Sequence, residues 1–259
     1  MKSFKLFSLL ICVTFCAAAF SGCGNKAEDD NNPKTGELTK MEQQFIEFAE
    51  EYKATFKPLT IDLYTKYFDA AITGKAEIWA SLAELEMKMN KMMTDDKKSF
   101  ELLKKFNQSD EITNPVIKRE VTAIYNEYLS KQVSNEKLDA MTKLQTEIEQ
   151  KYNNFRATVD GKELSDNEIE DILSTSADSK ELEAVWLAHK QIGPLVADDV
   201  LKLVKMRNEV AAELGFENYH TMSLTLSDQN PADIEKLFDE LDDLTRDAFA
   251  KLKGEIDAN

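Results

Sequence analysis

The sequence has no cysteine after residue 23. Its three cysteines, Cys12, Cys16 and Cys23, all lie at the amino terminus. A domain without thiols contains no disulfide and no cysteine-ligated metal, so its stability must come from buried apolar surface.

Positive charge is also scarce. The 259 residues include 32 lysines and arginines against 48 aspartates and glutamates, a formal net charge of −16. Such an excess repels nucleic acids and anionic membrane surfaces. No basic patch offsets it, so we expect no nucleic-acid partner, and any attachment to a membrane would depend on a lipid.

No apolar run reaches the roughly 20 residues that a membrane-spanning helix needs. The run at residues 6–20 follows Lys2 and Lys5 and precedes Ser21-Gly22-Cys23. A charged start, a short apolar run and small residues are typical of an export signal, predicted here at residues 1–22. Ser-Gly-Cys resembles a bacterial lipobox, which implies acylation of Cys23. The alternative is a plain secretory signal cut near Ala19.

Residues 23–38 contain almost no apolar side chain. Their polar composition, with glycine and proline, predicts a flexible tether. Lys26 followed by Glu28, Asp29 and Asp30 resembles the acidic export signal of bacterial surface lipoproteins, and a solvated linker is the alternative. The lipobox implies an exported protein anchored by lipid to the outer membrane, facing the periplasm or the cell surface.

Residues 39–259 are predicted to form one helical domain, because helix-start signals recur along it. Thr39 with Glu42, Ser165 with Glu168 and Asp178 with Glu181 have the spacing of capping boxes. Further starts are expected at Asn114-Pro115, Ser134 and Asn230-Pro231. Pro58 is expected to bend the first helix, and Asp160-Gly161 predicts a tight turn in a small β-hairpin at residues 155–164.

Residues 181–220 form the stretch around which the chain is expected to be organised. Apolar residues at helical spacing predict two helices that meet at a bend at Gly193-Pro194, the second ending at Gly215. The predicted core-facing residues of this stretch are Leu182, Val185, Trp186, Leu201, Val204 and Leu214.

The last predicted helix carries an apolar face that continues almost to Asn259. No closing glycine cap, proline or polar tail follows it. The pattern predicts a truncated core with an exposed apolar seam, and therefore self-association of the isolated chain.

Several of these motifs occur in the order found in a known family. Trp186, Gly193, the run at residues 203–208, Ala211 and Gly215-Phe216 follow Glu50-Glu51-Tyr52 and precede Asn230-Pro231. From about Glu42 to the last residue, the chain resembles the amino-terminal half of angiotensin-converting-enzyme-like zinc peptidyl-dipeptidases. This resemblance implies an all-α fold in which antiparallel helices form a lid and part of one half of a cleft-containing shell. Residues 39–71, 75–93 and 95–106 would correspond to the lid.

The resemblance also implies peptide hydrolysis by a zinc-activated water held by a His-Glu-x-x-His motif. The sequence has only two histidines, His189 and His220, followed by Lys190 and Thr221, so neither begins such a motif. We therefore expect no catalytic residue and no metal ligand in this chain, which would be inactive alone. Zinc is implied for the complete family member, and the missing carboxy-terminal half is an implied partner. Both histidines are expected to be buried and hydrogen-bonded.

Two other patterns have competing interpretations. Met87, Met89, Met92 and Met93 could bind cuprous copper, but methionine also fills irregular gaps between helices, which is the favoured interpretation. The acid pairs Asp198-Asp199 and Asp242-Asp243 are expected to be solvated, because neighbours on a helix do not face one another.

The favoured function is therefore the amino-terminal portion of an exported, lipid-anchored zinc metallopeptidase acting on peptides. The alternative is a non-catalytic helical lipoprotein that binds peptides or a protein partner. A metal-handling helical bundle built on the methionine cluster is a third hypothesis.

Overall fold

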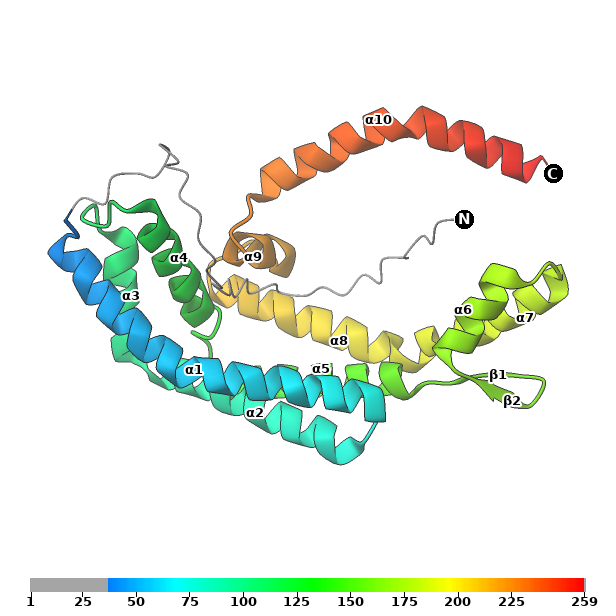
Figure 1. Cartoon of the computed structure of the whole chain (residues 1–259), viewed down its shortest axis with the longest axis horizontal. Coiled ribbons are helices and arrows are strands. Elements are labelled where there is room, and N and C mark those ends of the chain that lie inside the picture. Colours follow the sequence, from blue (N-terminus) through cyan, green and yellow to red (C-terminus); the bar gives the residue numbers. More distant parts are fainter. Residues whose placement is uncertain (1–36, 259) are drawn as a thin grey trace, which may run out of the picture. The chain divides into compact units, whose positions relative to one another are not determined.

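The computed structural model describes residues 37–258, so the predicted signal, Cys23 and nearly all of the predicted tether lie outside the described residues (Figure 1). The all-α prediction with one small hairpin is confirmed. The elements are α1 Lys40–Thr73, α2 Ala76–Asp95, α3 Lys97–Gln108, α4 Pro115–Leu129, α5 Asn135–Asn154, β1 Ala157–Val159, β2 Lys162–Leu164, α6 Asp166–Thr175, α7 Ser179–His189, α8 Ile192–Glu213, α9 Tyr219–Leu226 and α10 Pro231–Asp257.

Most of the predicted boundary signals are confirmed. Capping boxes begin α1 and α6, and the side chain of Asn114 accepts hydrogen bonds from the first turn of α4. The hairpin pairs Ala157 with Leu164 in antiparallel register, and its turn residues Asp160 and Gly161 both have positive φ. After α8, Gly215 has φ +87° and the Phe216 amide donates to the Ala211 carbonyl oxygen, the bond pattern of a helix closed by a left-handed glycine.

Helix α1 continues through Pro58, which is exposed, and its ribbon changes direction partway along, as an internal proline predicts (Figure 1). Two other local predictions need correction. Asp178 caps α7 through the Lys180 amide, while Glu181 bonds the Ser176 hydroxyl, so no capping box forms there. The break between α7 and α8 falls at Lys190 and Gln191. Gly193-Pro194 lies in the first turn of α8, where the missing proline amide would have no helical partner anyway.

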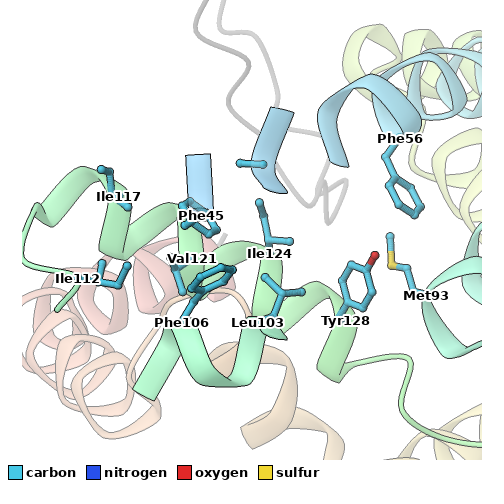
Figure 2. Close-up of a cluster of buried hydrophobic side chains, with 11 residues drawn as sticks. Phe45, Phe56, Met93, Leu103, Phe106, Ile112, Ile117, Val121, Ile124 and Tyr128 are labelled. Carbon is cyan, nitrogen blue, oxygen red and sulfur yellow. The ribbon is translucent and has the colours of Figure 1, made fainter. Parts of the chain in front are cut away.

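The principal core joins α1, α2, α3 and α4 (Figure 2). Phe45 and Phe106 meet edge to face with ring centroids 5.5 Å apart, and both rings are buried. Met93 is buried in this cluster, and Met89 and Met92 pack against it. The other buried members are Ala49, Phe56, Leu103, Ile112, Ile117, Val121, Ile124 and Tyr128.

Three smaller apolar clusters lie outside this core. Ala70 of α1 packs with Trp79 and Leu82 of α2. The hairpin packs on α6 and α7 through Ala157, Leu164, Ile169 and Val185. This contact supplies the support that an isolated two-stranded hairpin lacks. Val133, Leu138 and Val210 form the third cluster between α5 and α8.

One buried carboxylate ties the start of α1 to the loop before α4. Glu42 is only 2% exposed. Its Oε1 accepts hydrogen bonds from the Thr113 amide at 2.9 Å, the Thr113 hydroxyl at 3.1 Å and the Asn114 amide at 2.8 Å. Its Oε2 accepts from the Thr39 amide at 3.0 Å. The amide of Asn114, followed by that of Thr39, lowers the pKa of the Glu42 carboxyl below its usual value.

We predict that Glu42→Gln lowers the melting temperature by several degrees at pH 7, because a neutral amide cannot accept this set of bonds. Because the pKa of the Glu42 carboxyl is lower in the folded than in the unfolded protein, its ionisation stabilises the fold at pH values above the ordinary pKa of 4.5. This stabilisation is lost as the pH falls through the folded-state pKa. The difference in melting temperature between Glu42→Gln and the wild type should therefore become smaller at acidic pH, as measured by thermal unfolding followed by circular dichroism. Glu47→Gln, at an exposed position of α1, is the matched control and should have little effect at either pH. An equal loss of stability at both pH values would contradict the role of the charged carboxylate.

Candidate functional site

Helix α10 presents a continuous apolar face to solvent. None of its residues is buried, and seven large apolar side chains are between 45% and 79% exposed. These residues are Leu237, Phe238, Leu241, Leu244, Phe249, Leu252 and Ile256. We call this set the α10 face. The predicted exposed seam is therefore present.

The rest of the α10 surface is charged. Arg246 forms ion pairs with Asp242 and Asp243. One helical turn apart, Lys236 Nζ lies 3.7 Å from Glu240 Oε1. At 3.6 residues per turn, the α10 face covers an arc of about 140°, wider than the seam of a two-stranded coiled coil. This width is typical of a helix that lies on the core of a globular domain.

Leaving the α10 face in water forgoes a large amount of stabilisation. Burial of one large apolar side chain contributes about 1.5–3 kcal/mol, so seven half-exposed ones represent on the order of 10 kcal/mol. That is comparable with the total stability of an ordinary domain. The α10 face is therefore a strong candidate for an interface.

Helices α7 and α8 add a second exposed apolar surface. Trp186, Leu201 and Val204 are each between 45% and 59% exposed. Of the six predicted core-facing residues in this stretch, Val185 is buried and Leu182 and Leu214 are half-buried, with Leu214 packed against Val210 and its cluster. The core prediction is wrong for the other three, which are the exposed residues named above. The buried side of α8 is formed instead by Leu203, Val210 and Ala211. Periodicity found the helices, but it did not distinguish which apolar stripe faces the rest of the chain.

Behind the exposed surface of α8, a polar group of side chains joins α2, α5 and α8. The Arg207 guanidinium donates to Gln145 Oε1 at 2.9 Å, and Gln145 Nε2 donates to Glu149 Oε1 at 3.0 Å. Arg207 also lies over the Tyr219 ring, 4.9 Å from its centroid. Burial raises the pKa of the Glu149 and Glu86 carboxyls, and the Arg207 charge partly opposes this in both. These contacts fasten α8 and α9 to α5.

The two histidines do not come together. His189 is partly buried at the end of α7, with Nε2 4.0 Å from Asp166 Oδ1. His220 is exposed in the first turn of α9, so its predicted burial is wrong. Among residues 37–258, no three His, Cys, Asp or Glu side chains lie close enough to hold a metal ion. The described residues therefore do not fit a zinc centre.

The acid pairs are surface groups, as predicted. Asp199 pairs with Lys151, and Asp242 and Asp243 share Arg246. An open hollow of about 580 Å³ also contains acidic residues, including Asp95, Glu136 and Glu213. Asp95 accepts a hydrogen bond from Asn135 at 3.0 Å, and Glu213 pairs with Lys137. These carboxylates are already engaged with neighbouring side chains.

Comparison with known families gives a match over nearly all of the described residues. Residues 39–257 match the family model Peptidase_M2, angiotensin-converting enzyme. The chain belongs to the angiotensin-converting enzyme family. A comparison with curated protein sequences found no match. The family resemblance inferred from residue order along the chain is therefore confirmed, and a relation to peptidases with it.

Membership of this family implies zinc in the full protein, whereas the histidines of this chain form no zinc site. The predicted lipidation residue, Cys23, lies outside the described residues. Within the described part of the chain, no helix combines the length and apolarity needed to cross a membrane.

One apolar surface was not identified from the sequence. The structure buries Ala70 against α2, with Leu63 and Tyr67 beside it, and leaves Ile61, Tyr64 and Phe68 exposed. The sequence did contain a signal for this surface, because residues 61–72 are apolar on more than one side of the helix. Such a pattern indicates either burial on two faces or an interaction surface.

A pair of phenylalanines tests the state of the α10 face in the isolated chain. Phe45 is 0% exposed and Phe249 is 68% exposed. We predict that Phe45→Ala lowers the free energy of unfolding by about 3–5 kcal/mol, whereas Phe249→Ala changes it by less than about 0.5 kcal/mol. Urea denaturation measures both values. If Phe249→Ala were as destabilising as Phe45→Ala, the α10 face would already be buried in this chain.

Proposed function

We propose that this chain is the non-catalytic, amino-terminal portion of an exported zinc peptidase of the angiotensin-converting enzyme family, which hydrolyses peptides. The observation that carries the proposal is the family match over residues 39–257. In this proposal α1, α2 and α3 form the lid over the peptide-binding cleft, and α8 contributes to one wall. The zinc ligands and the catalytic groups belong to polypeptide outside this chain.

The exposed apolar surfaces support the proposal that a second part of the peptidase, carrying the zinc centre, packs against this chain. The α10 face and the exposed side of α8 are the surfaces on which the remaining half of such a peptidase would pack. Their burial would supply stabilisation on the order of 10 kcal/mol, which the described residues forgo. When bound in that half, zinc would activate the attacking water. The residues of this chain would serve to admit and orient the peptide.

The reading frame beyond the Asn259 codon tests this proposal. We predict that it continues into a His-Glu-x-x-His motif, and that the longer product hydrolyses fluorogenic peptides in a chelator-sensitive reaction. The present chain alone should retain no stoichiometric zinc after dialysis and should cleave no peptide. In the longer product, Leu244→Asp on the α10 face should reduce activity at least about tenfold, because a charge cannot be buried without a partner.

Val116→Asp is the control for this substitution. Val116 lies on α4, is 73% exposed and should tolerate the charge. A stop codon directly after Asn259, with a compact monomeric product, would overturn the peptidase proposal. It would favour the alternative of a non-catalytic helical lipoprotein that binds peptides or a protein partner.

We further propose that the protein is exported and acylated at Cys23, with the lipid held in the outer membrane. The support is the order of Lys2, Lys5, the apolar run and Ser21-Gly22-Cys23. Metabolic labelling with a palmitate analogue should modify the wild type, and Cys23→Ser should lose the label completely. Cys16→Ser is the matched control and should keep it, because that cysteine lies inside the predicted signal. An unlabelled wild type would end the lipoprotein proposal.

A further inference from the structure

The carboxy-terminal half of α1 carries an exposed apolar stripe of its own. Ile61, Tyr64, Phe68 and Ile72 are 59%, 53%, 62% and 64% exposed. With Thr60 and Thr65, the first three line a shallow, open hollow of about 450 Å³. We call Ile61, Tyr64, Phe68 and Ile72 the α1 stripe. Their spacing places them within about 100° of arc on the helix.

The α1 stripe is not the core-facing side of α1. That side carries Ala70, which is buried against Trp79 of α2, with Tyr67 meeting the Trp79 ring edge to face at 6.1 Å. Helix α1 is therefore already packed against the domain, and the stripe points away from that contact.

The charge pattern around the stripe differs from that of the chain as a whole. The protein carries a net charge of −16, yet no carboxylate lies within the arc of the stripe, and the nearest charge along it is Lys57. Asp62 and Asp69 lie outside the arc, on one side of it, and Asp62 is paired with Lys66 at 3.2 Å. An apolar strip with aromatic residues and a flanking lysine is typical of a helix that lies in a membrane interface.

We propose that the α1 stripe rests on the surface of an electrically neutral, zwitterionic lipid bilayer. The proposal depends on the acylation of Cys23 proposed above, which would bring the domain to the membrane. Tyr64 and Phe68 would sit among the headgroups, with Ile61 and Ile72 beside them and Lys57 reaching to the aqueous side. Contact with the bilayer would then orient the domain as well as hold it close.

The length of chain between the lipid and α1 permits this contact. Fifteen residues separate Cys23 from Thr39, which directly precedes α1, and they span at most about 55 Å when extended. The stripe begins about 30 Å along α1 from its first residue. A lipid held in the same bilayer also raises the effective concentration of the stripe, so that a weak interaction suffices.

A second copy of the chain fits the α1 stripe less well. Four half-exposed side chains offer a few hundred Å². A stable protein interface buries about 800 Å² on each partner. The stripe is therefore too small to hold a dimer alone, but it is large enough to orient a domain that a lipid already retains.

Tryptophan fluorescence on vesicles tests the proposal. The reporter is Phe68→Trp in the full acylated chain with Trp186→Phe, which leaves only the buried Trp79 as background. On phosphatidylcholine vesicles with brominated acyl chains, the reporter should lose more than about half of its emission. Adding Ile61→Ser and Ile72→Ser should abolish most of that quenching. Val116→Trp, an exposed apolar position on α4, is the matched control and should remain unquenched.

Three results would overturn the proposal. The first is a protein that floats with the vesicles while the reporter stays unquenched, because the lipid would then act as a tether alone. The second is a reporter shielded from acrylamide without vesicles at every protein concentration, because polypeptide would then cover the stripe. The third is shielding that increases with protein concentration, which would assign the stripe to a second copy. Palmitate labelling of the same preparation reports acylation separately, and no readout depends on peptidase activity.

Discussion

Burial of apolar side chains is the constraint on which this structure depends, because no thiol after residue 23 is available to cross-link it. The requirement is met unevenly. Helices α1 to α4 enclose a core with Phe45 and Phe106 at its centre, whereas α10 buries none of its residues. An isolated amphipathic helix gains little from propensity alone, so the α10 face needs a surface to pack on.

Zinc is implied for the angiotensin-converting enzyme family, to which the chain belongs. No three ligand-type side chains in residues 37–258 converge on a metal position. The polar contacts that are present, such as Arg207 with Gln145, fasten helices to one another.

Long-range polar contacts add specificity to the packed part of the chain. Glu42 accepts hydrogen bonds from the amide of Thr39 and from that of Asn114, which lies 72 residues after Glu42 in the sequence, so it sets the start of α1 against the start of α4. Its partner Thr39 also donates through its hydroxyl to the Glu111 carbonyl oxygen at 2.9 Å. A capping box, which is a local device, thus becomes a tertiary contact because its carboxylate is buried.

The sequence by itself determined the helices, most of their caps, the hairpin and the family. These features depend on residues within a few positions of one another, or on the order of motifs along the chain, and both can be read without a structure. The errors at Gly193-Pro194 and Asp178 were also local, since several nearby residues compete for the same helix start.

Only the tertiary structure decided which apolar face each helix buries. Leu201 and Val204 have the same spacing as a core stripe, yet the neighbouring stripe with Leu203 and Val210 faces the interior. Tyr64 and Tyr67 belong to the same helix, but only Tyr67 packs against Trp79. Periodicity records that a face is apolar, whereas burial depends on which other helix reaches it. That depends on contacts between residues far apart in the chain.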